Sequence, residues 1–194
     1  APQTQQATVD QAQNGVPVVN MAAPSKAGVS KNLFNDYNVN QPGVIMNNSL
    51  DVGRSQLGGA MYANPNYQGK AADIVVFEVT SEKQSRIQGY SEMFGKSAEF
   101  ILANPNGIYV NGGGFINVPR ATFITGQTFL DANGALSHIQ VNQGQVFVDQ
   151  LGFNASNMDY FDIIARSAKI QCEIWAGNEL NILTELIKIT NEHE

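Results

Sequence analysis

The sequence predicts an all-β domain built from many short strands, and it favours a solenoid in which those strands stack as coils. Short apolar stretches rich in β-branched and aromatic residues alternate with clusters of Gly, Asn, Pro and Ser almost to the end of the chain. Where a period can be read it is two, the period of a strand. Asn and Gln make up roughly a fifth of the chain, and stacked amides can form hydrogen-bonded ladders.

The composition excludes several classes of protein. The chain has 194 residues, of which 43% are hydrophobic, so it can bury a core and is not disordered as a whole. Its net charge is −6 and only 14% of its residues are charged. Because phosphate contacts need clustered Lys and Arg, we expect no nucleic-acid partner and no binding to an anionic membrane surface. A single cysteine, Cys172, allows no intrachain disulfide.

Along the chain, the elements begin after an N-terminal segment without an apolar pattern. Residues 1–15 are rich in Gln, Thr and Ala, which predicts a flexible arm. Each later strand-like stretch is bounded by turn-forming residues. These stretches are 16–19, 43–46, 74–79, 100–103, 107–110, 121–125, 139–141, 145–148 and 169–175.

Alternation along the late strands predicts which side chains face the core. Apolar residues occupy every second position in two stretches, so one set is expected inside and the other outside. The inward sets are Phe161, Ile163 and Ala165, and then Ile170, Cys172 and Ile174. The run 74–79 is apolar on both faces, which predicts cover from a further layer. Residues 91–97 and 180–189 fit either a helix or a strand.

Two architectures fit many short strands at close spacing. One is a sandwich or barrel of hairpins, and the other is a solenoid of parallel strands. Asn-Gly pairs at 14, 106, 111 and 133 signal hairpins in the first case and coil corners in the second. The amide-rich composition favours the solenoid. A solenoid needs a cap over its first coil, and residues 16–22 together with the arm are the candidates.

Catalytic and metal-binding patterns are weak in this sequence. His138 is expected to be a solvated side chain, because no Gly-x-Ser-x-Gly elbow accompanies it. Cys172 is expected to be a small buried hydrophobic residue rather than a ligand or nucleophile. The run 95–97 resembles part of a phosphate loop, but the required earlier glycine falls at Tyr90. We therefore expect no catalytic residue, no metal site and no cofactor.

Two tetrapeptides stand out as tight turns, one at 64–67 and the other at 104–107. In each, proline fixes φ at the second position, and the first asparagine can accept a hydrogen bond from the backbone two residues ahead. On local chemistry alone, the two segments are predicted to be ordinary β-turns. The residues are Asn64, Pro65, Asn66 and Tyr67 in the first, and Asn104, Pro105, Asn106 and Gly107, followed by Ile108, in the second.

Taken with their surroundings, these turns resemble the secretion domain of two-partner secretion exoproteins. This family includes filamentous haemagglutinins, haemolysins and contact-dependent growth inhibition proteins of Gram-negative bacteria. Four blocks in the same order carry the resemblance, which covers residues 16–185. The blocks are 16–24, then 32–39 with 43–49, then 77–80 with 85–90, and finally 103–108 with 114–117 and 120–122.

The resemblance implies a right-handed parallel β-helix with an N-terminal cap and small extra-helical β elements. It implies that residues 16–190 are the secretion domain at the start of a much longer adhesin or toxin. The implied partner is an outer-membrane transporter of the two-partner secretion type, Omp85-like and carrying POTRA domains. The chain is then a monomer that reaches the outside or the cell surface through the periplasm and outer membrane, nucleating β-helix folding during export. It is not itself an enzyme.

This chain differs from several family members at one corner, and the resemblance leaves two possible roles for the tetrapeptides. Several members carry Cys-x-x-Cys after the second turn, where this chain has Val110 and Gly113, so that corner must hold by turn chemistry and packing. The two tetrapeptides are either read directly by the transporter or build turns that present other residues, and turn-building is the favoured role. Outside this function, the alternatives are a carbohydrate-active enzyme on a β-helix and a structural adhesin fragment.

Overall fold

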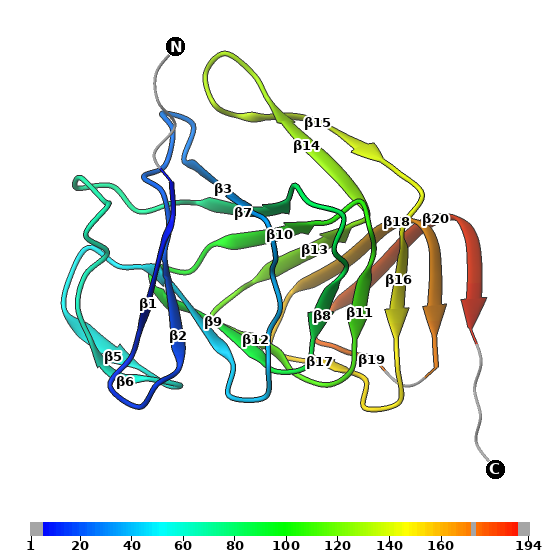
Figure 1. Cartoon of the computed structure of the whole chain (residues 1–194), viewed down its shortest axis with the longest axis horizontal. Coiled ribbons are helices and arrows are strands. Elements are labelled where there is room, and N and C mark those ends of the chain that lie inside the picture. The colour runs from blue at the N-terminus through cyan, green and yellow to red at the C-terminus, as the bar shows by residue number, and fades with distance from the viewer. Residues whose placement is uncertain (1–5, 172–173, 190–194) are drawn as a thin grey trace.

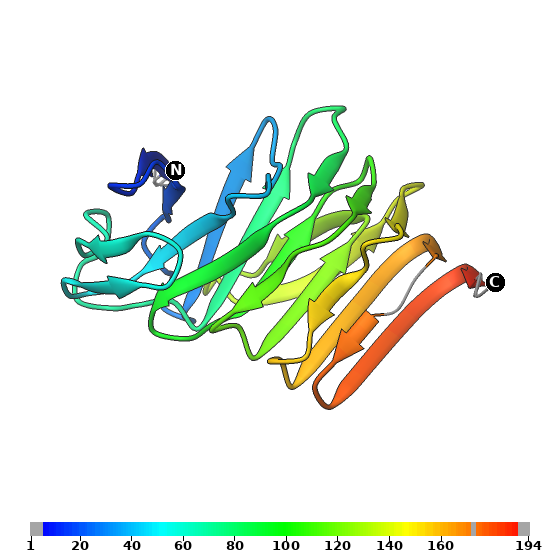
Figure 2. The same ribbon diagram turned by 90° about the horizontal axis from the view of Figure 1, so that it is seen from below.

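A computed structural model describes residues 6–171 and 174–189. Every regular element in this part of the chain is a β-strand, and the strands wind into coils that stack side by side from the N-terminal to the C-terminal end (Figures 1 and 2). No helix able to cross a membrane occurs among the described residues. Residues 91–97 and 180–189, which the sequence left open between helix and strand, lie in or overlap strands β9 (Tyr90–Gly95) and β20 (Glu179–Ile189).

The coils have three faces, which we name A, B and C. Strands β18 (Tyr160–Ile170) and β20 each run through faces B and C. The first half of β18 pairs with β13 (Arg120–Ile124), and its second half pairs with β16 (Gln145–Val148). Face A contains β2 (Pro17–Asn20), β4 (Val44–Asn48), β9 (Tyr90–Gly95), β12 (Gly114–Ile116), β17 (Phe153–Ala155) and β19 (Ile174–Ala176). Face B contains β3 (Val29–Phe34), β7 (Ile74–Val79), β10 (Glu99–Ala103) and β13. Face C contains β8 (Ser85–Ile87), β11 (Ile108–Val110) and β16. Strands β18 and β20 (Glu179–Ile189) contribute to both faces.

All strand pairs within these faces are parallel, which confirms the solenoid over the sandwich. In the described chain the antiparallel pairs are β1 (Thr8–Gln11) with β2, β5 (Gly53–Ser55) with β6 (Gly59–Met61), and β14 (Gly126–Leu130) with β15 (Leu136–Val141). The last two are the extra-helical elements. We number the coils 1 (β2, β3), 2 (β4, β7, β8), 3 (β9, β10, β11), 4 (β12, β13, β16), 5 (β17, β18) and 6 (β19, β20).

The interior is filled by aromatic rings that stack from coil to coil. Parallel register places Phe77, Leu102 and Phe123 in line on face B, and each is at most 1% exposed. Neighbouring phenylalanine rings lie 4.9–6.0 Å apart between centroids, a spacing that adds to the burial energy. The predicted inward set Phe161, Ile163 and Ala165 is confirmed as buried. Cys172 lies outside the described residues.

The outer side of face B is covered by the β14–β15 hairpin, which we call the return hairpin (residues 126–141). It leaves coil 4 after β13 and folds back over the face, at the top of Figure 1. Val76, Ile101 and Ile124 point outward from face B and form a buried cluster with Leu130 and Ile139 of the hairpin. The predicted cover over the run 74–79 is therefore confirmed.

The N-terminal segment contributes to the cap of coil 1. Where the sequence predicts a flexible arm, residues 8–11 form β1, which pairs antiparallel with β2 at the edge of face A. All four residues are exposed, so no apolar pattern marks this strand. Backbone hydrogen bonding to β2 provides the pairing, and Ala7 packs against the core.

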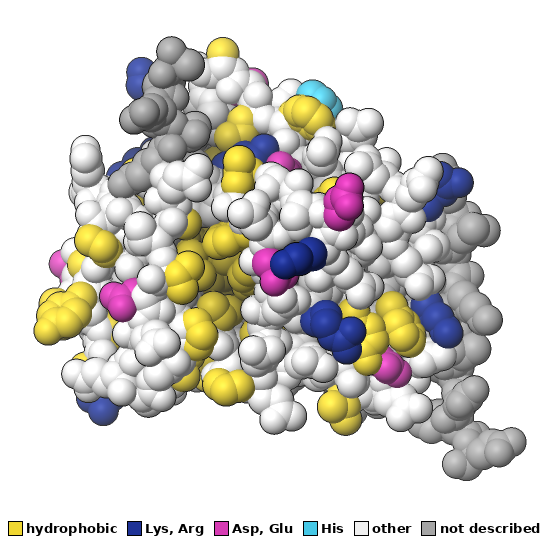
Figure 3. Space-filling view, viewed as in Figure 1, with side chains coloured by type: hydrophobic (Ala, Val, Ile, Leu, Met, Phe, Trp, Pro, Cys, Tyr) yellow, Lys and Arg dark blue, Asp and Glu magenta, His cyan; other side chains and the backbone are white. Residues whose placement is uncertain are grey.

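The four Asn-Gly pairs divide between the two kinds of turn. The pairs at 14 and 133 close the hairpins β1–β2 and β14–β15, whereas those at 106 and 111 form coil corners on either side of β11. The expected amide ladder is short in the described chain: Asn47 Nδ2 donates to Asn20 Oδ1 at 3.0 Å, and most other buried asparagines bond to backbone carbonyls. Figure 3 shows charged side chains scattered over this face, a few with opposite charges side by side, between larger areas of uncharged surface.

A buried tyrosine offers a test of the core. Tyr37 is 6% exposed and packs against Phe34 and Phe77, and its hydroxyl makes no hydrogen bond of normal geometry in the described part of the chain, although the Ser91 side chain lies near enough to oppose the effect of burial on its pKa. Burial raises the pKa of this phenol, so the group stays neutral. Because an unpartnered buried hydroxyl is unfavourable, Tyr37→Phe should raise the free energy of unfolding by about 1 kcal/mol. Denaturant melts would show this, and a loss of stability would reveal a partner for the hydroxyl.

Candidate functional site

The first motif, residues 64–67, turns the chain from face A to face B in coil 2. Asn64 is 3% exposed, and its Nδ2 donates to the carbonyls of Met21 at 3.0 Å and Asn47 at 2.9 Å. Its Oδ1 accepts the backbone N–H of Asn66 at 2.8 Å, and its carbonyl accepts the N–H of Tyr67 at 3.2 Å. One side chain therefore closes the turn and ties it to coil 1.

The other members of the first motif differ in what they offer to solvent. Asn66 Nδ2 donates to the carbonyls of Asn20 at 3.0 Å and Met21 at 3.3 Å. The Tyr67 hydroxyl donates to Asn48 Oδ1 at 2.7 Å, and burial raises the pKa of this phenol, which keeps it protonated. Pro65, in contrast, is exposed. The side-chain amides of this motif thus bond within the domain, whereas the ring of Pro65 is exposed to solvent.

The second motif, residues 104–107, turns the chain from face B to face C in coil 3. Asn104 is fully buried, and its Nδ2 donates to the Lys83 carbonyl and to Ser85 Oγ, both at 2.9 Å. Its Oδ1 accepts the N–H of Asn106 at 2.9 Å. Asn106 Nδ2 in turn donates to the Ser81 carbonyl at 2.6 Å. This corner is therefore tied to the B–C corner of coil 2.

The last positions of the second motif explain its glycine. Gly107 has φ 110°, and a Cβ there would lie 2.9 Å from the Gln145 carbonyl oxygen of coil 4. A side chain is therefore excluded both by backbone conformation and by the next coil. Ile108, the residue after it, is fully buried on β11. Pro105 is half-buried and lies against Gly144 of coil 4.

Both motifs have one design but occupy different corners. In each, the first asparagine caps its own turn, and two side-chain amides reach back to carbonyls at the same corner of the preceding coil. The first lies at the A–B corner of coil 2 and the second at the B–C corner of coil 3. The structure therefore does not bring the two predicted sites together into one surface.

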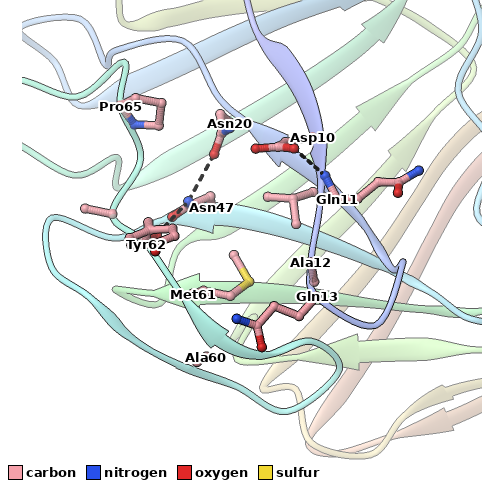
Figure 4. A pocket seen from close by; sticks show the side chains of 12 residues that line it. Asp10, Gln11, Ala12, Gln13, Asn20, Asn47, Ala60, Met61, Tyr62 and Pro65 are labelled. Atoms are coloured by element: carbon pink, nitrogen blue, oxygen red, sulfur yellow. Dashed lines mark hydrogen bonds between the residues drawn. The ribbon is translucent and has the colours of Figure 1, made fainter.

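A groove lies beside the first motif, with a volume of about 280 Å³. Figure 4 shows it between β1, the end of β6 and Pro65, with Asn47 donating to Asn20 across its floor. Tyr62, on its rim, is 82% exposed. Tyr62 and Pro65 are thus open to a partner at this corner, beside exposed polar side chains of β1 and of the turn after it, and the asparagine amides of the motif lie behind them.

At the corner without Cys-x-x-Cys, where the sequence predicts turn chemistry and packing, the structure shows backbone hydrogen bonds to neighbouring coils. The N–H of Asn111 donates to the Ile87 carbonyl at 2.8 Å, and that of Gly112 to the Gly152 carbonyl at 2.7 Å. A Cβ at Gly113 would lie 2.1 Å from the Gly89 carbonyl oxygen, so the backbone that connects β8 to β9 leaves no room for a cysteine there.

Sequence reasoning missed two carboxylates that hold the extra-helical hairpins. Glu92 on face A is 4% exposed; its oxygens accept from Ser55 Oγ at 2.6 Å and from the N–H groups of Gln56 and Leu57 at 2.9 Å, which anchors the β5–β6 turn. Glu78 on face B holds the return hairpin in the same way. An acidic residue inside an apolar strand was the available signal.

The other candidate catalytic and metal-binding side chains among the described residues do not come together in one site. His138 is exposed and stacks on Phe129 with ring centroids 4.5 Å apart. Within the described chain, no group of three or more His, Cys, Asp or Glu side chains is placed to hold a metal ion. The fold and its two tied corners therefore define a capped parallel β-helix domain.

Comparison with known proteins places this domain in a family. The chain matches the TPS secretion domain over residues 1–193, and it belongs to that family. It is 45% identical over 170 residues to the 16S rRNA endonuclease CdiA of Enterobacter cloacae, covering 87% of this chain and 5% of that protein. It is also 45% identical over 166 residues to the filamentous hemagglutinin of Bordetella pertussis, covering 86% of this chain and 4% of that one.

A solved structure agrees with the same assignment. The crystal structure of the filamentous hemagglutinin secretion domain superposes with a TM-score of 0.85 at 39% identity, covering 93% of this chain and 61% of that one. The resemblance drawn from the sequence blocks is thereby confirmed. The chain spans about a twentieth of the length of the curated relatives it matches.

Proposed function

We propose that this chain is the secretion domain of a large exoprotein, which its cognate outer-membrane transporter recognises, and that it nucleates β-helix folding during export. The observation that carries the proposal is the family match over residues 1–193. The parent protein is a contact-dependent inhibition toxin or an adhesin, supported by relatives that are a CdiA nuclease and a filamentous hemagglutinin.

The partner is a two-partner secretion transporter, Omp85-like and carrying POTRA domains, and the domain meets it as a monomer in the periplasm. Stacking supports a role in export, because the coils bury apolar side chains against one another in a shared core. At about 25 cal/mol per Å² of apolar surface, a few hundred Å² per coil opposes the chain's return. The exoprotein then reaches the outside or the cell surface.

Within this function, both motifs act as turn-builders. The side-chain N–H groups of Asn64, Asn66, Asn104 and Asn106 donate to partners inside the chain, so the folded domain holds these amides inward. What the first corner presents outward is Pro65 with Tyr62 and the groove between them. A transporter that meets the folded domain contacts those groups.

A competition experiment tests the function. The 194-residue chain is produced in the periplasm of cells that export the full-length exoprotein, and the exported amount is measured. We expect the chain to occupy the transporter and to reduce export. Undiminished export, with the chain shown to be folded and abundant in the periplasm, would contradict recognition.

Exchanging Tyr62 for alanine tests whether this side chain contacts the transporter, separately from any effect on folding. Because this side chain is 82% exposed, Tyr62→Ala should change the free energy of unfolding by less than about 0.5 kcal/mol. It should nevertheless weaken the competition severalfold. Leu151→Ala is the matched control, since Leu151 is 72% exposed but lies between β16 and β17. Equal competition by the two variants would remove Tyr62 from the contact.

A further inference from the structure

The return hairpin is tied to parts of the chain that precede it by 50 to 109 residues. The Lys31 ammonium on β3 of coil 1 donates to the Thr128 carbonyl at 2.7 Å, 97 residues away. At the hairpin tip, Ser25 Oγ donates to the Gly134 carbonyl at 2.8 Å, 109 residues away. The hairpin therefore runs from coil 4 back to the first coil of the domain.

The central tie is a buried carboxylate on coil 2. Glu78 is 8% exposed, and its Oε1 accepts both the backbone N–H of Thr128 at 2.7 Å and its hydroxyl at 2.9 Å. The other oxygen, Oε2, lies 3.6 Å from the Lys31 ammonium. Without the hairpin, this carboxylate would keep a cation but lose both of its hydrogen-bond donors.

The apolar side of the hairpin completes a core that coils 1 to 4 leave open. Val29, Val76, Ile101, Ala103 and Ile124 belong to β3, β7, β10 and β13, and all point outward from face B. They are at most 3% exposed because the hairpin residues cover them. The covering side chains are Leu130, Leu136 and Ile139.

We propose that the return hairpin is a latch: the face B strands of coils 1 to 3 become stable only when residues 126–141 close over them. Coils 1 to 3 then form one cooperative unit with the hairpin rather than folding one at a time. One consequence rests on the proposed function: during export, coils 2 and 3, which carry the two motifs, stay incompletely folded until residues 126–141 have also emerged and closed over them.

Native-state hydrogen exchange on the whole chain tests the latch. Glu78→Ala removes the acceptor for two hydrogen bonds, and Glu82→Ala is the control, since Glu82 is exposed. We expect exchange to accelerate at least about tenfold in β3, β7 and β10 as well as in the hairpin. Strands β16 and β17 should keep their protection, as should every strand in the control.

Two outcomes would overturn the latch. One is faster exchange in the hairpin alone, which would make it a passive cover. The other is an equal loss of protection in all strands, which would make Glu78 a general stabilising residue. If Glu78→Ala does not fold, Thr128→Val, which removes only the hydroxyl donor, serves in the same measurement.

The unmodified chain offers an independent test through pulsed hydrogen exchange during refolding. The latch requires β3 and β7 to gain protection in the same phase as β14 and β15, or after it. Protection of β3 and β7 in an earlier phase would overturn it. Neither exchange measurement uses a transporter. If the exchange results were as expected but the chain did not reduce export in the competition experiment, only the proposed function would be contradicted.

Discussion

Replacing Asn104 with alanine should lower the free energy of unfolding by about 3 kcal/mol. The change removes donors to the Lys83 carbonyl and to Ser85 Oγ, and it removes the acceptor for the Asn106 N–H. Because Asn104 is fully buried, water does not replace these partners. Denaturant melts would measure the loss, and competition for export should fall with the folded fraction.

Two further variants sharpen this result. Asn104→Asp keeps an acceptor for Asn106 but places a carboxylate against the Lys83 carbonyl, so it should destabilise the domain at least as much. Asn133→Ala is the control, since this asparagine is exposed at the tip of the return hairpin. If Asn104→Ala abolished export while stability and transporter affinity stayed normal, the motif would serve neither as a turn nor as a contact.

Phe123→Ala should cost about 4 kcal/mol of unfolding free energy, the usual cost of emptying a fully buried aromatic site. The Phe123 ring is 1% exposed and lies 5.2–6.0 Å from the rings of Phe115, Phe153 and Phe161, so its removal opens a cavity at the centre of the stack. Thermal and denaturant melts would show the loss.

The control for this change is Phe129→Ala on β14. Phe129 is 36% exposed and stacks on His138 outside the coils, so its loss should cost less than about 1.5 kcal/mol. Equal effects of the two substitutions would mean that the coils do not share a continuous aromatic core.

Much of the fold could be predicted because strands and tight turns are local. Period-two alternation correctly placed Phe161, Ile163 and Ala165 in the core, and the apolar run 74–79 correctly indicated a covering layer. Both Asn-Pro-Asn segments are the predicted turns. Residues 8–11 escaped notice because an edge strand held by backbone bonds needs no apolar side chains.

The sequence by itself determined the class of fold, the positions of the corners and, through four ordered blocks, the family. Only the tertiary structure decided which Asn-Gly pairs close hairpins, which carbonyls the motif amides reach, and that Glu78 and Glu92 hold two hairpins onto the coils. The physical reason is distance along the chain. Turn and strand preferences act between near neighbours, whereas a contact such as that of Ser25 with Gly134, 109 residues apart, exists only once the register of the stacked coils is set.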